Sequence, residues 1–380
     1  MKANKLSGRA RHSIVTREFD WVLFAITLLI AVFGIIVVYS ATRTTGSNSN
    51  VIVQSAAFCL GIGLMFAICF FDYEQFENVV KYIYIFAVAI LIFVLIFGVG
   101  DENWGARSWI RIGSVGFQPA EFAKLCFILT FSYHLSKVDG RINEIKILLG
   151  LIAHFALLLI LILLEPDMGS SMVFIFMFVC MLFVAKISYK YIIPVLAAGI
   201  ISLPIIYNFI LEDYQRKRID VFFDPTIAPL DEGYNVIQSK IAVGSGQLWG
   251  QGYLEGTQNQ MGLIPSKTTD FIFSVLSEEF GFIGASLVVI LLFILIYRCF
   301  KAAKKADNTF GRYICVGVAS MFLFHVFENV GMCIGIMPVT GIPLPFISYG
   351  GTSLVTNMAA VGLVLSVTYH NKPRVKVDVY

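Results

Sequence analysis

The sequence predicts an all-α, polytopic membrane protein. Of its 380 residues, 58% are hydrophobic and only 14% are charged, whereas roughly a quarter are charged in a soluble domain. Apolar runs of about 20 residues, each long enough to cross a bilayer as a helix, recur along the chain. The first run lacks a small-residue cleavage site and is followed by similar runs, so it is not read as a signal peptide. The net charge of +3 gives no support for a nucleic-acid partner.

Ten membrane-spanning helices are predicted within a single membrane domain covering residues 1–380. They occupy residues 20–40, 52–71, 80–98, 119–135, 147–164, 168–185, 190–210, 270–297, 312–336 and 348–369. Lysine and arginine gather in the head of the chain, in alternate loops and in the tail, as they do on the cytoplasmic side of membrane proteins. We therefore expect cytoplasmic tails at 1–19 and 370–380.

The segment 211–269 interrupts this alternation and is predicted to be a long extracytoplasmic loop between the seventh and eighth spans. Loops longer than about 15 residues are usually functional or disordered, and this one is not of low complexity. Its stretch EGYNVIQSKIAVGSG carries apolar residues at helical spacing and ends in glycines. That pattern predicts an amphipathic helix with a C-terminal stop.

A lone aspartate, Asp270, stands in the stretch SKTTDFIFSVLSEEFG, where the polar loop meets the eighth span. Its position at a helix start suits a capping acid. Burial that raised its pKa toward the working pH would equally suit a general base. The residues alone leave both roles open. Glu278 and Glu279, about two turns deeper, are interpreted as packing or network groups.

Charged residues also gather before and within the fourth span, in the stretch WGARSWIRIGSVGFQPAEFAK. It contains Arg107 and Arg111, followed by Glu121 and Lys124. The last two are three residues apart, so they share a helix face and can pair with each other. The alternative is that these residues form the charged wall of an outward-facing cavity, since ionisable groups at membrane depth usually mark function.

Two further stretches supply polar groups on the same side. Asp167, in LLEPDMGSS, is placed to cap the sixth span and can also line a site. The stretch MPVTGIPLPFISYGGTS has three prolines and three glycines, which predict irregular backbone. Such backbone is tolerated at membrane depth where it is buried in protein or lines a cavity. Ser348 would then offer hydrogen bonds near that cavity.

The spacing of Gly331 and Gly335 in the ninth span would let another helix approach closely, although such spacing is frequent by chance. We take this span, together with the eighth span next to it, as the predicted docking face for a partner. Several cations, Lys240 among them, suit an anionic headgroup on the outer side. The residues thus indicate a polar cavity for an amphiphile with a phosphate-bearing head, but they fix no reaction.

Four long stretches resemble the SEDS family of bacterial cell-wall proteins. They are GARSWIRIGSVGFQPAEFAK, NVIQSKIAVGSGQLWGQGYLEGTQNQ, IPSKTTDFIFSVLSEEFG and FENVGMCIGIMPVTGIPLPFISYGGTS. The similarity extends over nearly the whole chain, and two of the stretches are closest to the family's elongation members, which maintain cell shape. It implies a peptidoglycan glycosyltransferase in the bacterial cell membrane that polymerises lipid II outside the membrane. It also implies a class B penicillin-binding protein as the transpeptidase partner.

The resemblance also implies roles for individual residues. The family's essential aspartate falls on Asp270, its conserved acid and lysine fall on Glu121 and Lys124, and the aspartate of its Pro-Asp motif falls on Asp167. The residue before that motif is often glutamine in the family, whereas here it is Glu165, which puts the role of that position in doubt.

On this basis Asp270 is expected to remove the proton from the acceptor sugar's 4-hydroxyl, while Arg107, Arg111 and Lys124 neutralise the leaving pyrophosphate. No metal-binding motif is present, so the sequence leaves open whether a divalent cation such as Mg²⁺ or Mn²⁺ assists. A lipid II flippase, or a non-enzymatic scaffold that recruits the penicillin-binding protein, would use the same cavity without a base.

Overall fold

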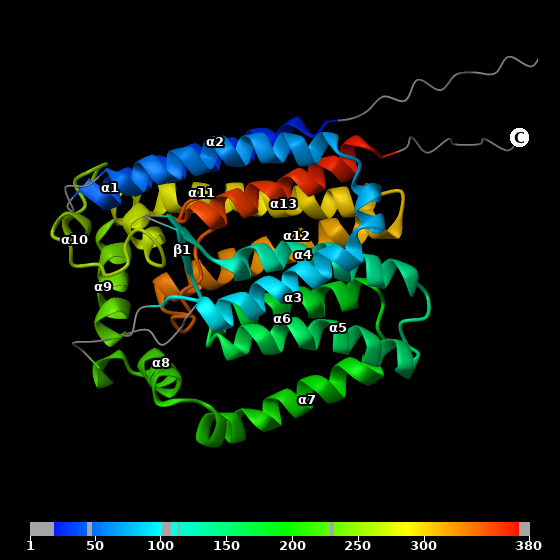
Figure 1. Ribbon diagram of the computed structural model, residues 1–380. Helices are drawn as coiled ribbons and strands as arrows, with labels where there is room; N and C mark the ends of the chain where they lie inside the picture. Colours follow the sequence, from blue (N-terminus) through cyan, green and yellow to red (C-terminus); the bar gives the residue numbers. More distant parts are fainter. Residues whose placement is uncertain (1–18, 44–47, 101–107, 113–114, 229–231, 372–380) are drawn as a thin grey trace, which may run out of the picture.

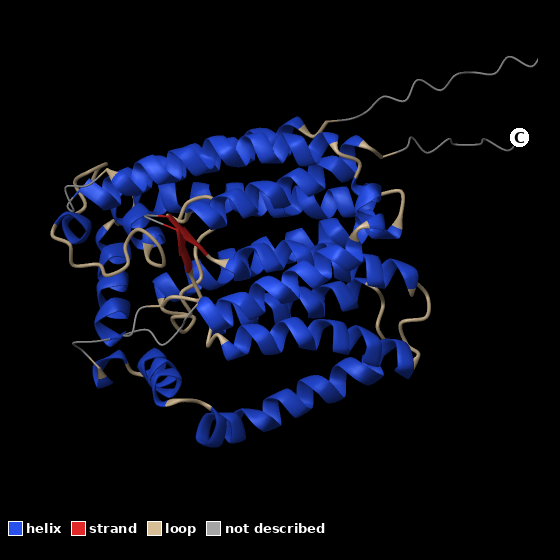
Figure 2. Cartoon of the chain, in the orientation of Figure 1, coloured by secondary structure: helices blue, strands red, loops and turns tan. Residues whose placement is uncertain are grey.

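The computed structural model describes residues 19–43, 48–100, 108–112, 115–228 and 232–371, which form a bundle of long helices (Figures 1 and 2). The long helices are α1 (Trp21–Thr42), α2 (Ser49–Phe70), α3 (Val80–Phe97), α4 (Pro119–Lys137), α5 (Ile145–Leu164), α6 (Met168–Val184), α7 (Tyr189–Ile205), α11 (Ile272–Lys305), α12 (Thr309–Ile334) and α13 (Gly351–Tyr369). The shorter elements are η2 (Tyr73–Asn78), η3 (Ile206–Ile210), α8 (Asp213–Phe223), η4 (Pro225–Ile227), α9 (Glu232–Ser245) and α10 (Thr257–Gln260).

Each predicted span corresponds to one of the long helices, and the prediction of an all-α polytopic membrane protein is confirmed. Among the described residues, seven helices are long and apolar enough to cross a bilayer: α1, α2, α3, α5, α11, α12 and α13. The apolar helix α6 is shorter, α4 carries buried charges, and α7 contains Pro194 and Pro204. A small antiparallel pair of strands, β1 (Ile110–Ile112) and β2 (Val115–Phe117), precedes α4.

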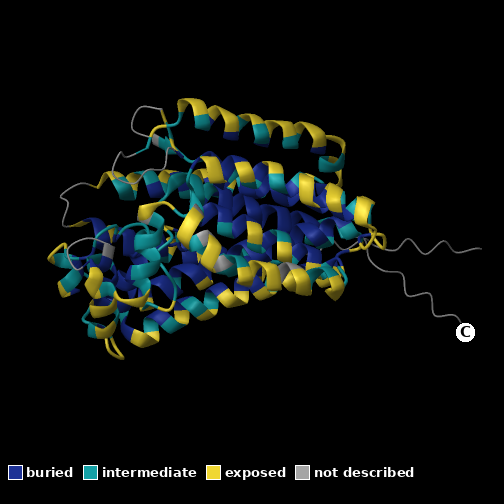
Figure 3. Ribbon diagram, turned by 90° about the horizontal axis from the view of Figure 1, so that it is seen from below, coloured by how far each residue is buried: buried dark blue, intermediate teal, exposed yellow. Residues whose placement is uncertain are grey.

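The helices differ in how far the protein itself buries them. In α12 and α13, 78% and 72% of the most apolar stretch is buried, against 22–39% in the other five spanning candidates. Figure 3 shows this as a dark centre with exposed residues on the outer helices. The outer residues are largely apolar, such as Ile96, which is 67% exposed. An apolar outer surface around a buried bundle suits lipid contact.

Helix α11 is broken at Gly281, which sequence analysis had treated as the interior of one continuous span. Gly281 has φ 65° and ψ −169°. The loop at 246–252 attaches to the break: the amides of Phe282 and Ile283 donate to the carbonyls of Gln247 and Leu248 at 2.8 and 3.2 Å. A Cβ on Gly281 would lie 2.3 Å from the amide nitrogen of Gly250, so the approach requires glycine. The loop thereby satisfies backbone groups that the break frees.

The segment 211–269 folds over one end of the bundle as α8, η4, α9 and α10 (Figure 1). The amphipathic helix predicted there is confirmed as α9, which packs on α11 and α12. The Ser239 hydroxyl joins all three helices, because it lies 2.6 Å from the Ser274 hydroxyl and donates to the Cys333 carbonyl at 2.8 Å. Helix α7 runs along the edge of the bundle, apart from the other long helices in the view of Figure 1.

Candidate active site

Asp270 lies in the loop directly before α11, and its backbone is held from two sides. The Asn329 amide group on α12 donates to the Asp270 carbonyl at 2.8 Å and also to the Ile342 carbonyl at 2.8 Å. The Ser348 hydroxyl donates to the Thr269 carbonyl at 2.7 Å. The irregular backbone predicted for 337–353 is confirmed at 338–350, whereas 351–353 already belong to α13. Through Ile342 and Ser348 this stretch fastens the Asp270 loop to the bundle.

The Asp270 carboxylate does not cap α11. The N-cap residue of this helix is Phe271, and no side chain bonds there. The carboxylate instead lies beside Gly341, where a Cβ would sit 3.8 Å from Oδ2. Burial raises the pKa of Asp270 to about 6, while a hydrogen bond from the Thr269 side chain and the charge of Arg218 lower it. A partly buried carboxylate with a pKa near neutrality suits a general base.

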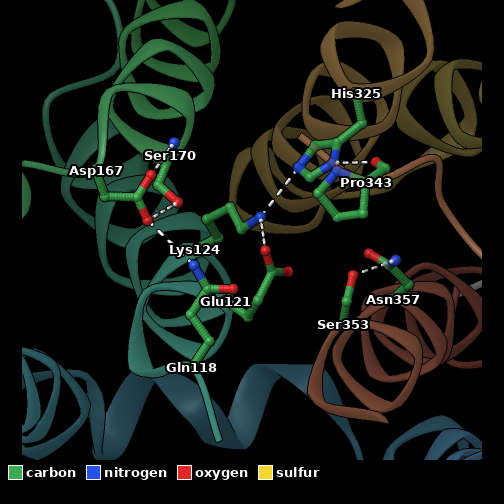
Figure 4. Close-up of polar contacts among 9 residues, drawn as sticks. All are labelled: Gln118, Glu121, Lys124, Asp167, Ser170, His325, Pro343, Ser353 and Asn357. Carbon is green, nitrogen blue, oxygen red and sulfur yellow. Dashed lines mark hydrogen bonds and ion pairs between the residues drawn. The ribbon is translucent and has the colours of Figure 1, made fainter. Parts of the chain in front are cut away.

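Glu121 and Lys124 form a buried chain with His325 between α4 and α12 (Figure 4). Lys124 Nζ lies 2.7 Å from Glu121 Oε1 and 3.0 Å from His325 Nε2. His325 Nδ1 lies 3.1 Å from the Pro343 carbonyl. Because a carbonyl only accepts, Nδ1 carries the proton and Nε2 accepts from Lys124. The expected pairing of Glu121 with Lys124 is confirmed, and the chain ties α4 to the 338–350 stretch.

Asp167 is the N-cap of α6, as one of the two sequence-based alternatives had it. Its carboxylate accepts from the Ser170 amide at 2.9 Å and from the Ser170 hydroxyl at 2.8 Å. It also accepts from the side chain of Gln118, just before α4, at 3.1 Å (Figure 4). Three bonds from two elements occupy this carboxylate and join the starts of α4 and α6.

The remaining predicted site residues lie apart from this network. Arg111 is exposed on β1, and Lys240 is exposed on α9. Arg107 lies outside the described residues. Gly331 is buried, and a Cβ there would meet the Met337 side chain at 2.8 Å. Gly335 ends α12 as its left-handed C-cap with φ 77°, and the Lys240 side chain lies against it. Both glycines thus have contacts within the chain itself.

Glu278 and Glu279 are network groups, as the sequence interpretation held. Glu278 accepts from the amides of Gln258 and Asn259 at 2.6 and 3.0 Å, at the start of the short helix α10. Glu279 accepts from the Asn259 side chain at 2.9 Å and from the Ser40 hydroxyl of α1. These carboxylates fasten the long loop and α1 to the part of α11 that precedes Gly281.

Sequence reasoning missed Arg218 on α8. It lines a pocket with Phe222, Asn235 and the stretch 337–339, and its charge reaches Asp270. The stretch DYQRKR, which places three cations in six residues of the long loop, was the available signal. Among the described residues, no group of three or more His, Cys, Asp or Glu side chains is placed to hold a metal ion.

Glu165, the position that departs from the family pattern, is buried at the C-cap of α5. Neither of its carboxylate oxygens has a hydrogen-bond partner among the described residues. Burial, together with the charge of Asp167, raises its pKa to about 8. The surroundings of Glu165 therefore disfavour the charged form of its carboxyl group.

Comparison with known proteins identifies relatives along almost the whole chain. Residues 20–373 match the sequence profile of the FtsW, RodA and SpoVE family, described as "Cell cycle protein". The peptidoglycan glycosyltransferase MrdB of Escherichia coli K12 is 35% identical over 93% of this chain and 95% of its own length. Stage V sporulation protein E of Bacillus subtilis is 36% identical over 93% of this chain and 98% of its own length.

Two solved structures share the fold. A chain from a structure described as "Structural coordination of polymerization and crosslinking by a peptidoglycan synthase complex" matches with a TM-score of 0.79 at 30% identity, over 92% of this chain and 97% of that one. The crystal structure of the rod shape determining protein RodA from Thermus thermophilus matches with a TM-score of 0.68 at 27% identity, over 92% of this chain and 96% of that one.

Proposed function

Because this chain belongs to the FtsW, RodA and SpoVE family of cell cycle proteins, the SEDS family, we propose that it is a peptidoglycan glycosyltransferase. Its substrate is lipid II, which it polymerises into β-1,4-linked glycan strands during cell elongation and shape maintenance. Support comes from relatives named as peptidoglycan glycosyltransferases at 35% and 34% identity. The likeness to a RodA structure favours the elongation role.

The mechanism rests on one observation. Hydrogen bonds fix the backbone of Asp270, while its carboxylate does not cap α11. In the proposed step, Asp270 accepts the proton of the acceptor's 4-hydroxyl as that oxygen attacks the anomeric carbon of the growing strand. The bond from this carbon to the pyrophosphate oxygen breaks, and its electron pair leaves with undecaprenyl pyrophosphate. A base held at a fixed position is the arrangement that such proton transfer requires.

Cations on the same side would offset the charge of the departing pyrophosphate. Arg218 is favoured because its charge reaches Asp270, and the exposed Arg111 and Lys240 are further candidates. Lys124 is already paired with Glu121 and buried, so we assign it a positioning role through His325. Ser348 positions the Asp270 loop.

We also propose that all ten long helices span the membrane, with both termini in the cytoplasm and the Asp270 site outside. The distribution of lysine and arginine supports this orientation. The loop 211–269 then covers the extracytoplasmic end of the bundle.

The proposed partner is a class B penicillin-binding protein that cross-links the strands. A relative of this fold was solved within a peptidoglycan synthase complex described as coordinating polymerization and crosslinking. We retain the exposed face of α12 as the proposed docking surface. Gly331 and Gly335, however, already contact side chains of this chain. Phe327 is 55% exposed on this helix and is the better probe. Phe327→Ala should reduce recovery of the partner, whereas unchanged co-purification would place docking elsewhere.

The deciding experiment gives lipid II to the purified protein together with its partner and compares wild type with Asp270→Ala and Asp270→Asn. We expect polymer from the wild type and none above background from either variant, with partner binding retained. Normal polymer from both variants would refute the base. Asp270-independent movement of lipid II across vesicles without polymer would identify a flippase, and partner recruitment alone would identify a scaffold.

A further inference from the structure

A polar pocket lies at the end of the bundle where α1 begins and α13 ends, far along α11 from Asp270. The start of α1, the last turns of α11 and the end of α13 form it. Its volume is about 100 Å³, and its polar lining includes Asp20, Arg298, Lys301, Lys305 and Asn371. The proposed glycosyltransferase reaction uses none of these residues.

Among the described residues that line the pocket, three are basic and one is acidic. Arg298 Nε donates to Asp20 Oδ2 at 3.0 Å, and Arg298 Nη2 donates to Asp20 Oδ1. Asp20 Oδ1 also accepts from the Leu23 amide at 3.0 Å, so this carboxylate caps α1 as well. One acid faces three cations of the lining, Arg298, Lys301 and Lys305. The bidentate pair also fixes the plane of the guanidinium, which orients it before any ligand arrives.

An aromatic row beside the pocket marks its depth in the membrane. Phe19, which lines the pocket, lies 4.6 Å from Trp21 and 6.5 Å from Phe66 between ring centroids. The row continues from Phe66 through Phe70 to Tyr369 at the end of α13. Trp21 is 69% exposed. Exposed tryptophan and tyrosine rings gather at the level of lipid headgroups, so the pocket opens at that level.

A simpler account assigns the lysines to the helix dipole, because cations near a helix C-terminus are favourable. That account covers Lys304 and Lys305, which lie in the last turn of α11. It does not cover Lys301, which lies before that turn, or the fixed Arg298. The dipole also gives no reason for the pocket between three helices.

We propose that this pocket binds the phosphodiester headgroup of an anionic phospholipid, such as phosphatidylglycerol. The phosphate contacts Lys301, Lys305 and the fixed guanidinium of Arg298, and the acyl chains lie along the aromatic row. Basic pockets between membrane helices bind such headgroups through these forces. A bound lipid would bridge the ends of α1, α11 and α13.

The test measures binding of dioleoylphosphatidylglycerol to the full-length protein in neutral detergent by native mass spectrometry. The test variant is Lys301→Gln/Lys305→Gln. The matched control is Lys304→Gln/Lys146→Gln, which loses the same charge at two exposed lysines outside the pocket. The pocket variant should weaken binding about tenfold or more, because each lysine near a lipid headgroup contributes about 1 kcal/mol. The control should change binding less than about threefold, consistent with long-range charge alone.

Three results would overturn the proposal. Equal weakening in the control variant would mean diffuse surface attraction. Competition by dioleoylphosphatidylcholine would mean that acyl chains alone bind, and displacement by inorganic phosphate at millimolar concentration would mean a site for free anions. The readout is lipid binding rather than polymerisation, so it does not depend on the proposed enzyme activity.

Discussion

Asp167 and Asp270 each lie just before a long helix, and they are used in opposite ways. Asp167 commits its carboxylate to the start of α6 through three hydrogen bonds from Ser170 and Gln118. At Asp270 the carbonyl accepts the bond from α12, the carboxylate has only its neighbour Thr269 as a named hydrogen-bond partner, and Phe271 occupies the N-cap of α11 without a side-chain bond. A carboxylate that already holds structure together is poorly suited to exchange protons. The comparison therefore separates an architectural acid from an acid available for chemistry.

The most direct test makes the same isosteric substitution, aspartate to asparagine, at Asp270 and at Asp167. Asp270→Asn removes the base, so we expect lipid II polymerisation to fall about a hundredfold or more. Asp167→Asn keeps an oxygen that can cap α6, so its rate should stay within about threefold of wild type. The measurement is the initial rate of glycan polymerisation by each purified variant. Similar losses of polymerisation rate in both variants would show that the two aspartates do not differ in role.

The stability of Asp270→Asn gives an internal control on that result. The folded state holds the pKa of Asp270 above its ordinary value, so the folded protein binds more protons than the unfolded chain between about pH 4 and pH 6. Stability from this group is thus lost as the pH rises through 6. At pH 7 the asparagine variant should melt at or above the wild-type temperature, which would exclude unfolding as the cause of inactivity.

The next prediction concerns the buried chain of Glu121, Lys124 and His325. Like Asp167, these side chains bond to other groups of the protein. Lys124→Met leaves the Glu121 carboxylate buried beside His325 without its cation. We expect a loss of about 3 kcal/mol of stability, because removing one partner of a buried ion pair leaves an uncompensated charge. The double variant Glu121→Gln/Lys124→Met should recover much of it. Thermal unfolding in detergent would measure both, and a double variant no better than the single one would argue against the pair.

A smaller effect should appear in the pH dependence. If the Asp270 carboxylate is the base, the rate should rise with pH through about 6, the pKa that burial gives it. Between pH 5 and pH 7 the ionised fraction of such a group increases roughly tenfold, and the rate should follow. The measurement is polymerisation in a pH series, with Asp167→Asn run in parallel. A rate that does not change between pH 5 and pH 7 would mean that a group other than Asp270 accepts the proton.

The smallest expected effect is the loss of the α6 cap. Asp167→Ala removes the bonds from Ser170 and Gln118, and we expect about 1 kcal/mol of destabilisation, as for other N-cap substitutions. Asp167→Ser, which can still cap, should retain most of that stability. Urea unfolding of the two variants would compare them, and an alanine variant as stable as wild type would show that the cap is dispensable.

Sequence alone predicted the positions of the long helices well, because most of them are apolar runs of bilayer length. It also predicted α9 and the irregular stretch at 338–350 from their glycines, prolines and apolar spacing. Whether Asp270 caps its helix could not be predicted, because a shift of the helix start by one residue changes the answer. The hydrogen bond from Asn329 to the Asp270 carbonyl joins residues 59 positions apart, and local sequence patterns cannot predict such a contact.

Two other failures have equally physical causes. The break at Gly281 leaves an apolar run on either side, so hydropathy sees one span, and the bonds that stabilise it come from 246–252. Arg218 lay in a run of charges typical of a solvated loop, and only the folding of α8 over the bundle brings it near Asp270. The docking role predicted for Gly331 and Gly335 stays a prediction, and the structure adds only that Gly335 ends its helix.

The contact between Ser40 and Glu279 has a consequence for biogenesis. The two residues are separated by 239 positions, so α1 enters the membrane long before its partner is synthesised. Glu278 and Glu279 are costly for a helix that inserts alone. The groups that bond them, at Gln258 and Asn259, emerge from the ribosome immediately before α11. We therefore expect the preceding loop to pair these carboxylates while α11 inserts, and we expect a shortened loop to leave α11 outside the bilayer before any catalytic defect is seen.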